Sequence, residues 1–137
     1  MNNEQASKEW LDFAVMDYQS AEFLMQMRPV PLEIVCYHCE QAAEKMLKGF
    51  LVYHNVDVPK THDLGQLCEL CGNIDSTFED IIGICLDLSP YAVQVRYPFH
   101  IELEEIDMQS ALNDCKVVMD FIDKRLEMEQ GQTIKME

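Results

Sequence analysis

The segment Tyr37–Phe50, reading YHCEQAAEKMLKGF, constrains the fold of this chain more than any other stretch. It contains neither proline nor a β-branched residue and consists almost entirely of helix-favouring residues, which predicts an α-helix. Apolar residues form a broad stripe on one face, and the other face carries charges, with Glu44 and Lys48 in the favourable i,i+4 order. Such a stripe is buried by packing against further helices, so the segment predicts a helical domain.

Helical periodicity and its interruptions divide the rest of the chain. Prolines break the pattern near residues 29–31 and at Pro59, Thr61 is a candidate N-cap, and Ser76 to Glu79 read as a capping box. The expected helices span residues 7–27, 31–55, 62–71, 76–88 and 103–128. The sequence therefore predicts an all-α, five-helix, antiparallel up-and-down bundle over residues 7–128, with flexible segments at 1–6 and 129–137.

The charge distribution restricts the possible ligands. The formal net charge is −15, from 25 acidic and 10 basic residues. Non-specific affinity for nucleic acid comes mainly from lysine and arginine, so this composition argues against a general nucleic-acid binder, and we expect no DNA binding. Lys45 and Lys48 lie in a stretch where charges balance, whereas residues 61–95 hold six acids and neither lysine nor arginine. A phosphate site is therefore expected near Lys45, Lys48 and Arg96.

Compartment and metal content follow from the cysteines and the apolar runs. No apolar run reaches membrane-spanning length and the first ten residues are polar, so we expect a cytoplasmic protein with reduced thiols and no membrane contact. Cys36-x-x-Cys39 and Cys68-x-x-Cys71 permit a four-thiolate zinc site. Both pairs fall inside expected helices, where cysteine serves as a small apolar residue, so we expect no metal and no cofactor.

Asp17 is the one charged position in the apolar stripe of the first helix. Trp10, Ala14 and Ala21 recur at helical spacing around it, and Val15 widens the stripe. A carboxylate on an inward face needs a partner or water. Asp17 is therefore either a structural hydrogen-bonding residue or part of a polar groove.

Three motifs carry a family resemblance. The segment HCEQAAEKMLKG at 38–49 is followed by PKTHDL at 59–64 and YAVQVRYP at 91–98, and together they resemble the HEPN domain over most of the chain. The resemblance implies a small helical bundle that commonly dimerises, and aromatic Tyr91, Tyr97 and Phe99 offer apolar surface for a homodimer. Its RYP form is similar to the branch often encoded beside a minimal nucleotidyltransferase, which implies that partner and a toxin–antitoxin role.

The resemblance also implies two kinds of activity. As a binding module, the protein would hold phosphate of a nucleotide or RNA with Lys45, Lys48 and Arg96, and Asp17 and Tyr97 would line the site. Active HEPN ribonucleases instead use an arginine and a histidine separated by four to six residues. Here Arg96 and His100 have three residues between them. The alternatives are thus a metal-independent endoribonuclease using Arg96 and His100, or a non-catalytic dimeric scaffold.

Overall fold

A computed structural model describes residues 2–92 and 102–136, with side chains described through residue 129. The helices are α1 (Asn3–Leu24), α2 (Leu32–Tyr53), α3 (Leu64–Ile74), α4 (Ile82–Leu88) and α5 (Glu105–Met136), with short 3₁₀ helices η1 (Ser76–Ile81) and η2 (Ser89–Ala92). Within these described ranges the chain contains no strand. The predicted all-α bundle with five α-helices is confirmed.

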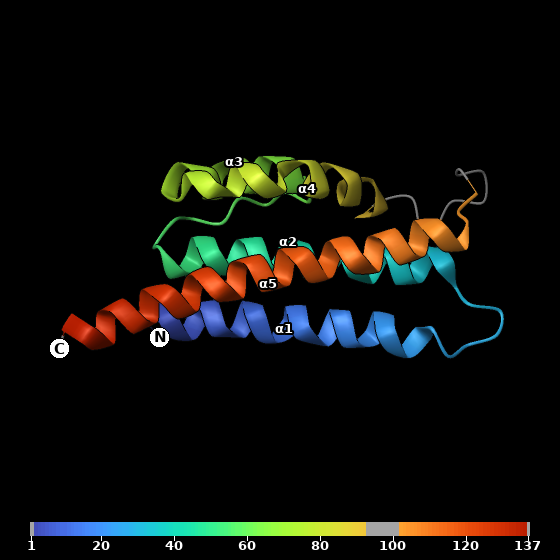
Figure 1. The fold of residues 1–137 in the computed structure, drawn as a ribbon, viewed down its shortest axis with the longest axis horizontal. Helices are drawn as coiled ribbons and strands as arrows, with labels where there is room; N and C mark the ends of the chain where they lie inside the picture. Colours follow the sequence, from blue (N-terminus) through green and yellow to red (C-terminus); the bar gives the residue numbers. More distant parts are fainter. Residues whose placement is uncertain (1, 93–101, 137) are drawn as a thin grey trace.

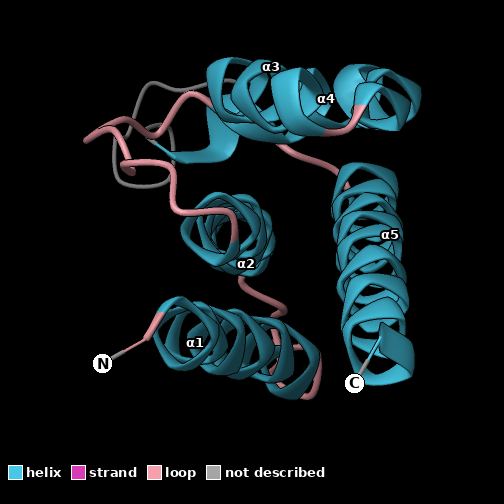
Figure 2. Ribbon diagram, turned by 90° about the vertical axis from the view of Figure 1, so that its left-hand side faces the viewer, coloured by secondary structure: helices cyan, strands magenta, loops and turns pink. Residues whose placement is uncertain are grey.

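The helices surround α2, which lies at the centre of the bundle. In Figure 1, α1 runs along one edge, α2 returns beside it, α3 and α4 form a layer above, and α5 runs back along α2. Figure 2 shows α1 and the α3–α4 layer on opposite sides of α2, with α5 along a third side. Because it has neighbours on three sides, α2 supplies much of the core.

The core is aliphatic, with an aromatic group where α2, η1 and α5 meet. Phe78 lies between Phe50 and Phe121, with ring centroids 4.6 and 5.0 Å away. By contrast, α1 fully buries only the small residues Ser7, Ala14 and Ala21. Small residues at seven-residue spacing bring α1 close to α2, and Ser7 Oγ donates a 2.7 Å hydrogen bond to the carbonyl of Gly49.

Side-chain caps set several helix boundaries differently from the sequence prediction. Asp63, and not Thr61, caps α3, because its carboxylate accepts from the Gln66 amide at 3.2 Å. Asp75, and not Ser76, caps the next element, which begins as a 3₁₀ helix. An Asn2 cap starts α1 at Asn3, and α5 continues to Met136. The boundaries predicted at 7 and 128 thus fall inside helices, while flexibility of the terminal segments stays a prediction.

The cysteines contribute to the core. All six are buried free thiols, and the two CxxC pairs lie within α2 and α3, as predicted. In the part of the chain that the structure describes, no three His, Cys, Asp or Glu side chains are grouped as metal ligands would be. Nor is any helix in that part both long and apolar enough to span a bilayer.

Candidate functional site: the polar network of α2

One side of α2 carries a continuous set of charged and polar side chains, which we call the α2 polar network. Its members are Asp17, His38, Glu40, Gln41, Glu44, Lys45, Lys48 and His62. Most come from α2 at spacings of three or four residues, so they share one side of the helix. Asp17 joins it from α1, and His62 from the loop before α3.

The first cluster of the network joins α1 to α2 through Asp17. One carboxylate oxygen lies 2.9 Å from His38 Nδ1, and the other accepts a hydrogen bond from Lys45 Nζ. Asp17 is mostly buried, whereas about a quarter of each partner's side chain stays exposed. Asp17 thus has the structural partners that its position required. His38 also lines a shallow groove of about 520 Å³ between the two helices, but Asp17 does not line it. The contacts of Asp17 therefore match its interpretation as a structural hydrogen-bonding residue, and a role in a polar groove stays a prediction.

The second cluster is centred on the buried carboxylate of Glu44. Lys48 Nζ donates to one oxygen at 2.9 Å, and His62 Nδ1 lies 2.9 Å from the other. Lys48 Nζ also lies 5.7 Å from the ring centroid of Trp10, within range of a cation–π contact. These partners compensate the desolvation of Glu44, since a buried charge is tolerated when it is paired and hydrogen-bonded.

Glu40 is the most unusual member of the network. Its side chain is 0% exposed and one oxygen accepts a 2.8 Å hydrogen bond from Gln41. Among the described residues, no donor lies within hydrogen-bonding distance of its Oε2. Burial, with a further contribution from the neighbouring Glu44 carboxylate, raises the pKa of Glu40 to about 8. Glu40 therefore carries a proton near neutral pH and is available as a neutral hydrogen-bond donor.

Three of the predicted site residues belong to the α2 polar network. Asp17, Lys45 and Lys48 lie on the facing sides of α1 and α2, and a carboxylate already holds each ammonium group. Lys45 keeps about a quarter of its side chain exposed, while Lys48 is buried. Whether either lysine binds phosphate stays a prediction.

The other predicted site residues, Arg96, Tyr97 and His100, lie outside the described residues, as does Phe99. Tyr91 is described and half-buried, and burial, with a smaller contribution from Cys36, raises the pKa of its hydroxyl to about 12. Tyr91 lies in η2, which packs on α2.

Sequence reasoning missed the roles of Glu40, Glu44 and His62. The ring of His62 contacts Glu44, which lies 18 residues away in sequence. The available signal was the i,i+4 spacing of Glu40, Glu44 and Lys48 on a helix with apolar residues around most of its circumference. Charged side chains on a helix that has neighbours on three sides become buried, and buried charges require ion-pair or hydrogen-bond partners.

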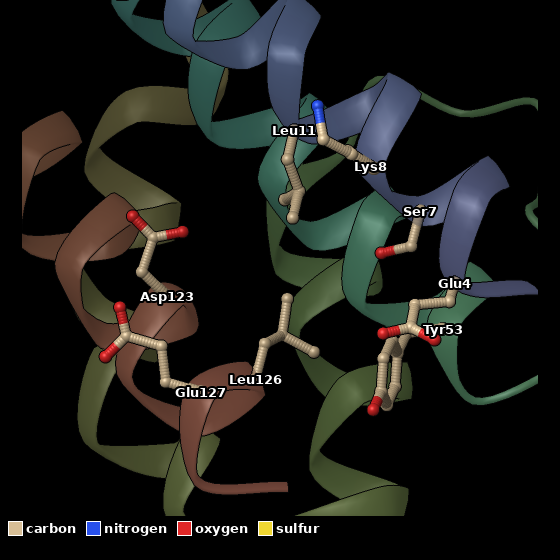
Figure 3. A pocket seen from close by; sticks show the side chains of 8 residues that line it. All are labelled: Glu4, Ser7, Lys8, Leu11, Tyr53, Asp123, Leu126 and Glu127. Carbon is tan, nitrogen blue, oxygen red and sulfur yellow. The ribbon is translucent and has the colours of Figure 1, made fainter. Parts of the chain in front are cut away.

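A separate hollow lies between α1, α2 and α5, at the end of the bundle where the chain starts (Figure 3). It measures about 260 Å³ and is lined by Glu4, Ser7, Lys8, Leu11, Tyr53, Asp123, Leu126 and Glu127. Burial, with the charges of Glu127 and Asp120, raises the pKa of Asp123. Three of the lining side chains are carboxylic acids and Lys8 is the one basic residue among them, so this hollow is a poor phosphate site.

Comparisons with known proteins support the helical fold described above. The crystal structure of TT1696 from Thermus thermophilus superimposes with a TM-score of 0.73 at 22% identity, covering 90% of this chain and 98% of that one. This likeness concerns the fold alone. No curated protein matches the chain. The sequence model of the HEPN domain matches residues 7–126. The chain therefore belongs to the HEPN domain family.

Proposed function

We propose that this chain is a dimeric HEPN module that binds the phosphate of a nucleotide or RNA and works with a minimal nucleotidyltransferase, as half of a toxin–antitoxin pair. The observation that carries the binding proposal is the convergence of Lys45, Lys48 and two histidines on the α2 polar network. In a chain with net charge −15, such a gathering of nitrogen donors is the best available place for an anion.

Chain connectivity supports a role for Arg96 at this network. The 3₁₀ helix η2 packs on α2, and Cys36, which influences Tyr91, precedes Glu40 by one helical turn. Arg96 follows Ala92, the last residue of η2, by four positions in the sequence. In the proposal, its guanidinium binds phosphate oxygens as a fork.

The lysines have unequal parts in this proposal. Lys45 is partly exposed and can turn toward a phosphate while it remains near Asp17. Lys48 is buried and its ammonium group is held by Glu44, so it has to leave that carboxylate to contact a phosphate. We therefore expect binding to depend on Arg96 first, on Lys45 second and on Lys48 least.

Fluorescence anisotropy with a labelled mixed-sequence RNA, and with labelled ATP, tests the binding proposal. We expect Arg96→Ala to weaken binding by about 1–3 kcal/mol, the scale of a lost charge-assisted hydrogen bond. Lys116→Ala is the control, because it removes one positive charge from an exposed i,i+4 pair on α5. Equal losses in the two variants would show that affinity follows net charge, and the site assignment would be abandoned.

A second candidate function, metal-independent RNA cleavage, is favoured by the Arg96-x₃-His100 motif. A histidine that titrates near neutrality transfers protons at the ribose hydroxyl and leaving oxygen, while the arginine stabilises charge on the phosphate. Incubation of RNA with the purified protein in EDTA tests this. Turnover that disappears in His100→Ala supports cleavage, and intact RNA with the unaltered protein rejects it.

The partner proposal requires a separate measurement. Mixing the purified chain with a short nucleotidyltransferase protein encoded beside it should give a complex that elutes earlier than either protein in size-exclusion chromatography. Separate elution at micromolar concentrations would reject the partner while leaving phosphate binding untouched.

A further inference from the structure

Helix α1 has a second apolar face that the rest of the fold does not cover. Four large apolar side chains on this face point outward: Phe13, Met16, Phe23 and Met27, the last just beyond the helix end, are 57, 61, 68 and 50% exposed. The residues that it fully buries are small. In Figure 1, α1 forms the lower edge of the bundle, and α2 and α5 both lie above it. Val15, predicted to face inward, is also exposed.

These four exposed residues, with the half-buried Ser20 among them, follow a regular spacing. Phe13, Met16, Ser20, Phe23 and Met27, which we call the outer α1 stripe, are separated by three, four, three and four residues. Alternation of three and four is the spacing that keeps a seam of one helix against a partner helix. Beside the stripe lies the shallow groove between α1 and α2, into which Met16, Ser20 and Phe23 also project. The outer α1 stripe is therefore shaped to receive a helix.

We propose that a second copy of this chain docks on the outer α1 stripe, with the two α1 helices antiparallel and a two-fold axis beside Ser20. The spacing supports this partner because the stripe is nearly symmetric about Ser20. Its other residues lie three and seven positions after Ser20, and four and seven positions before it. In this register Phe13 faces the partner's Met27, and Met16 faces the partner's Phe23. In both of these pairs an aromatic ring faces a flexible thioether. The small Ser20 faces the partner's Ser20 where the two helices cross. A self-complementary surface is what a two-fold dimer requires.

The exposed area is sufficient for a dimer. A large apolar or aromatic side chain has about 150–250 Å² of surface, so the four exposed here offer roughly 400–500 Å² per protomer. Stable interfaces bury about 800 Å² per partner, of which the apolar share is somewhat over half. The outer α1 stripe thus supplies the apolar part of an ordinary interface. This inference deepens the dimeric part of the proposed function and does not depend on RNA binding.

Light scattering on the full chain tests the interface. At about 50 µM, a typical working concentration for micromolar association, we expect twice the 15.9 kDa chain mass for the unaltered protein. Phe23→Glu should be a monomer with unchanged helical circular dichroism. Ile106→Glu is the matched control, since it places the same charge on an apolar residue of α5 that is 69% exposed, and it should remain a dimer. A monomeric unaltered protein, or a dimeric Phe23→Glu, would overturn the proposal.

Cross-linking tests the register without disturbing the packing. Ser20→Cys should form a disulfide-linked dimer under mild oxidation, because the two-fold axis brings the new thiol next to its copy. The six native cysteines are buried, so they do not compete. Glu22→Cys, an exposed position on α1 away from the outer α1 stripe, is the control and should not cross-link. Failure of Ser20→Cys to cross-link in a dimeric protein would reject this interface.

RNA affinity of Phe23→Glu separates this inference from the proposed function. A monomer with unchanged affinity supports the interface and shows that binding does not need the dimer. If the unaltered protein is a dimer that fails to bind RNA or ATP, the interface stands and the binding proposal fails.

Discussion

Nδ1 of His62 lies 2.9 Å from Oε1 of Glu44, joining the loop before α3 to the middle of α2. The ring is largely exposed whereas the carboxylate is buried, so the histidine lies over the carboxylate on its solvent side. With Lys48 on the other oxygen, this contact satisfies the acceptors of Glu44 in the interior. It links two of the three segments on which the family resemblance depends.

Glu40 should make the stability of the protein depend on pH. Its pKa is about 8 in the folded chain against an ordinary value of 4.5, so the folded state holds the proton more tightly. The free energy of unfolding should therefore fall as the pH rises from 4.5 through 8, and level off above that. The difference between 4.5 and about 8 corresponds to a total fall of about 5 kcal/mol attributable to Glu40.

Glu40→Gln should remove most of that fall, since the amide keeps an acceptor for Gln41 and does not ionise. Urea unfolding of both proteins at a pH below and a pH above this window measures the difference. The same change in unfolding free energy in both proteins would mean that Glu40 ionises freely in the fold.

Asp17→Asn should destabilise the protein by about 1–3 kcal/mol, because it weakens the hydrogen bonds to His38 and Lys45 together. Asp120→Asn is the matched control, as Asp120 pairs with Lys116 on the surface. Its effect should be within about 0.5 kcal/mol. Thermal unfolding followed by circular dichroism gives both values, and similar small shifts would show that the Asp17 cluster contributes little to stability.

Alanine substitutions at Gly72 and Gly49 should have different effects on the free energy of unfolding. A Cβ at Gly72 meets nothing within 4 Å, so Gly72→Ala in α3 should gain about 0.5–1 kcal/mol from helix propensity. At Gly49 the new carbon would lie 2.9 Å from Leu11 Cδ2 and 3.3 Å from Trp10 Cβ, so α1 must shift and the gain should be lost. Denaturant midpoints of the two variants, compared with that of the unaltered protein, test whether α1 packs this closely on α2.

Phe78→Ala should cost about 3–5 kcal/mol, because it leaves a cavity between Phe50 and Phe121 in a fully buried position. Leu86→Ala provides the comparison, since Leu86 is 57% exposed on the neighbouring α4. Its effect should be several-fold smaller. Equal costs in urea unfolding would contradict the assignment of Phe78 to the centre of the core.

Local sequence determined the helices and the breaks between them. The helix-favouring run from Tyr37 to Phe50 and the prolines at 29, 31 and 59 fix where α2 begins and ends to within a few residues, since propensity and backbone geometry act over a single turn. The family motifs, which are also local in sequence, were sufficient to recognise the HEPN domain. The caps were less predictable, because Thr61 and Asp63 both suit a helix start and only the path of the loop selects Asp63.

Tertiary structure alone decided which charges are buried and which apolar residues are not. Asp17 obtains its partners from α2, and Glu44 obtains one from a loop 18 residues away, so no local pattern specifies either contact. Helical periodicity gave α1 a single inward stripe, yet the close approach of α2 admits only Ser7, Ala14 and Ala21 fully, and leaves Phe13 and Phe23 outside. The physical reason is that burial depends on where neighbouring helices lie and how near they come, and both are set by packing across the whole bundle.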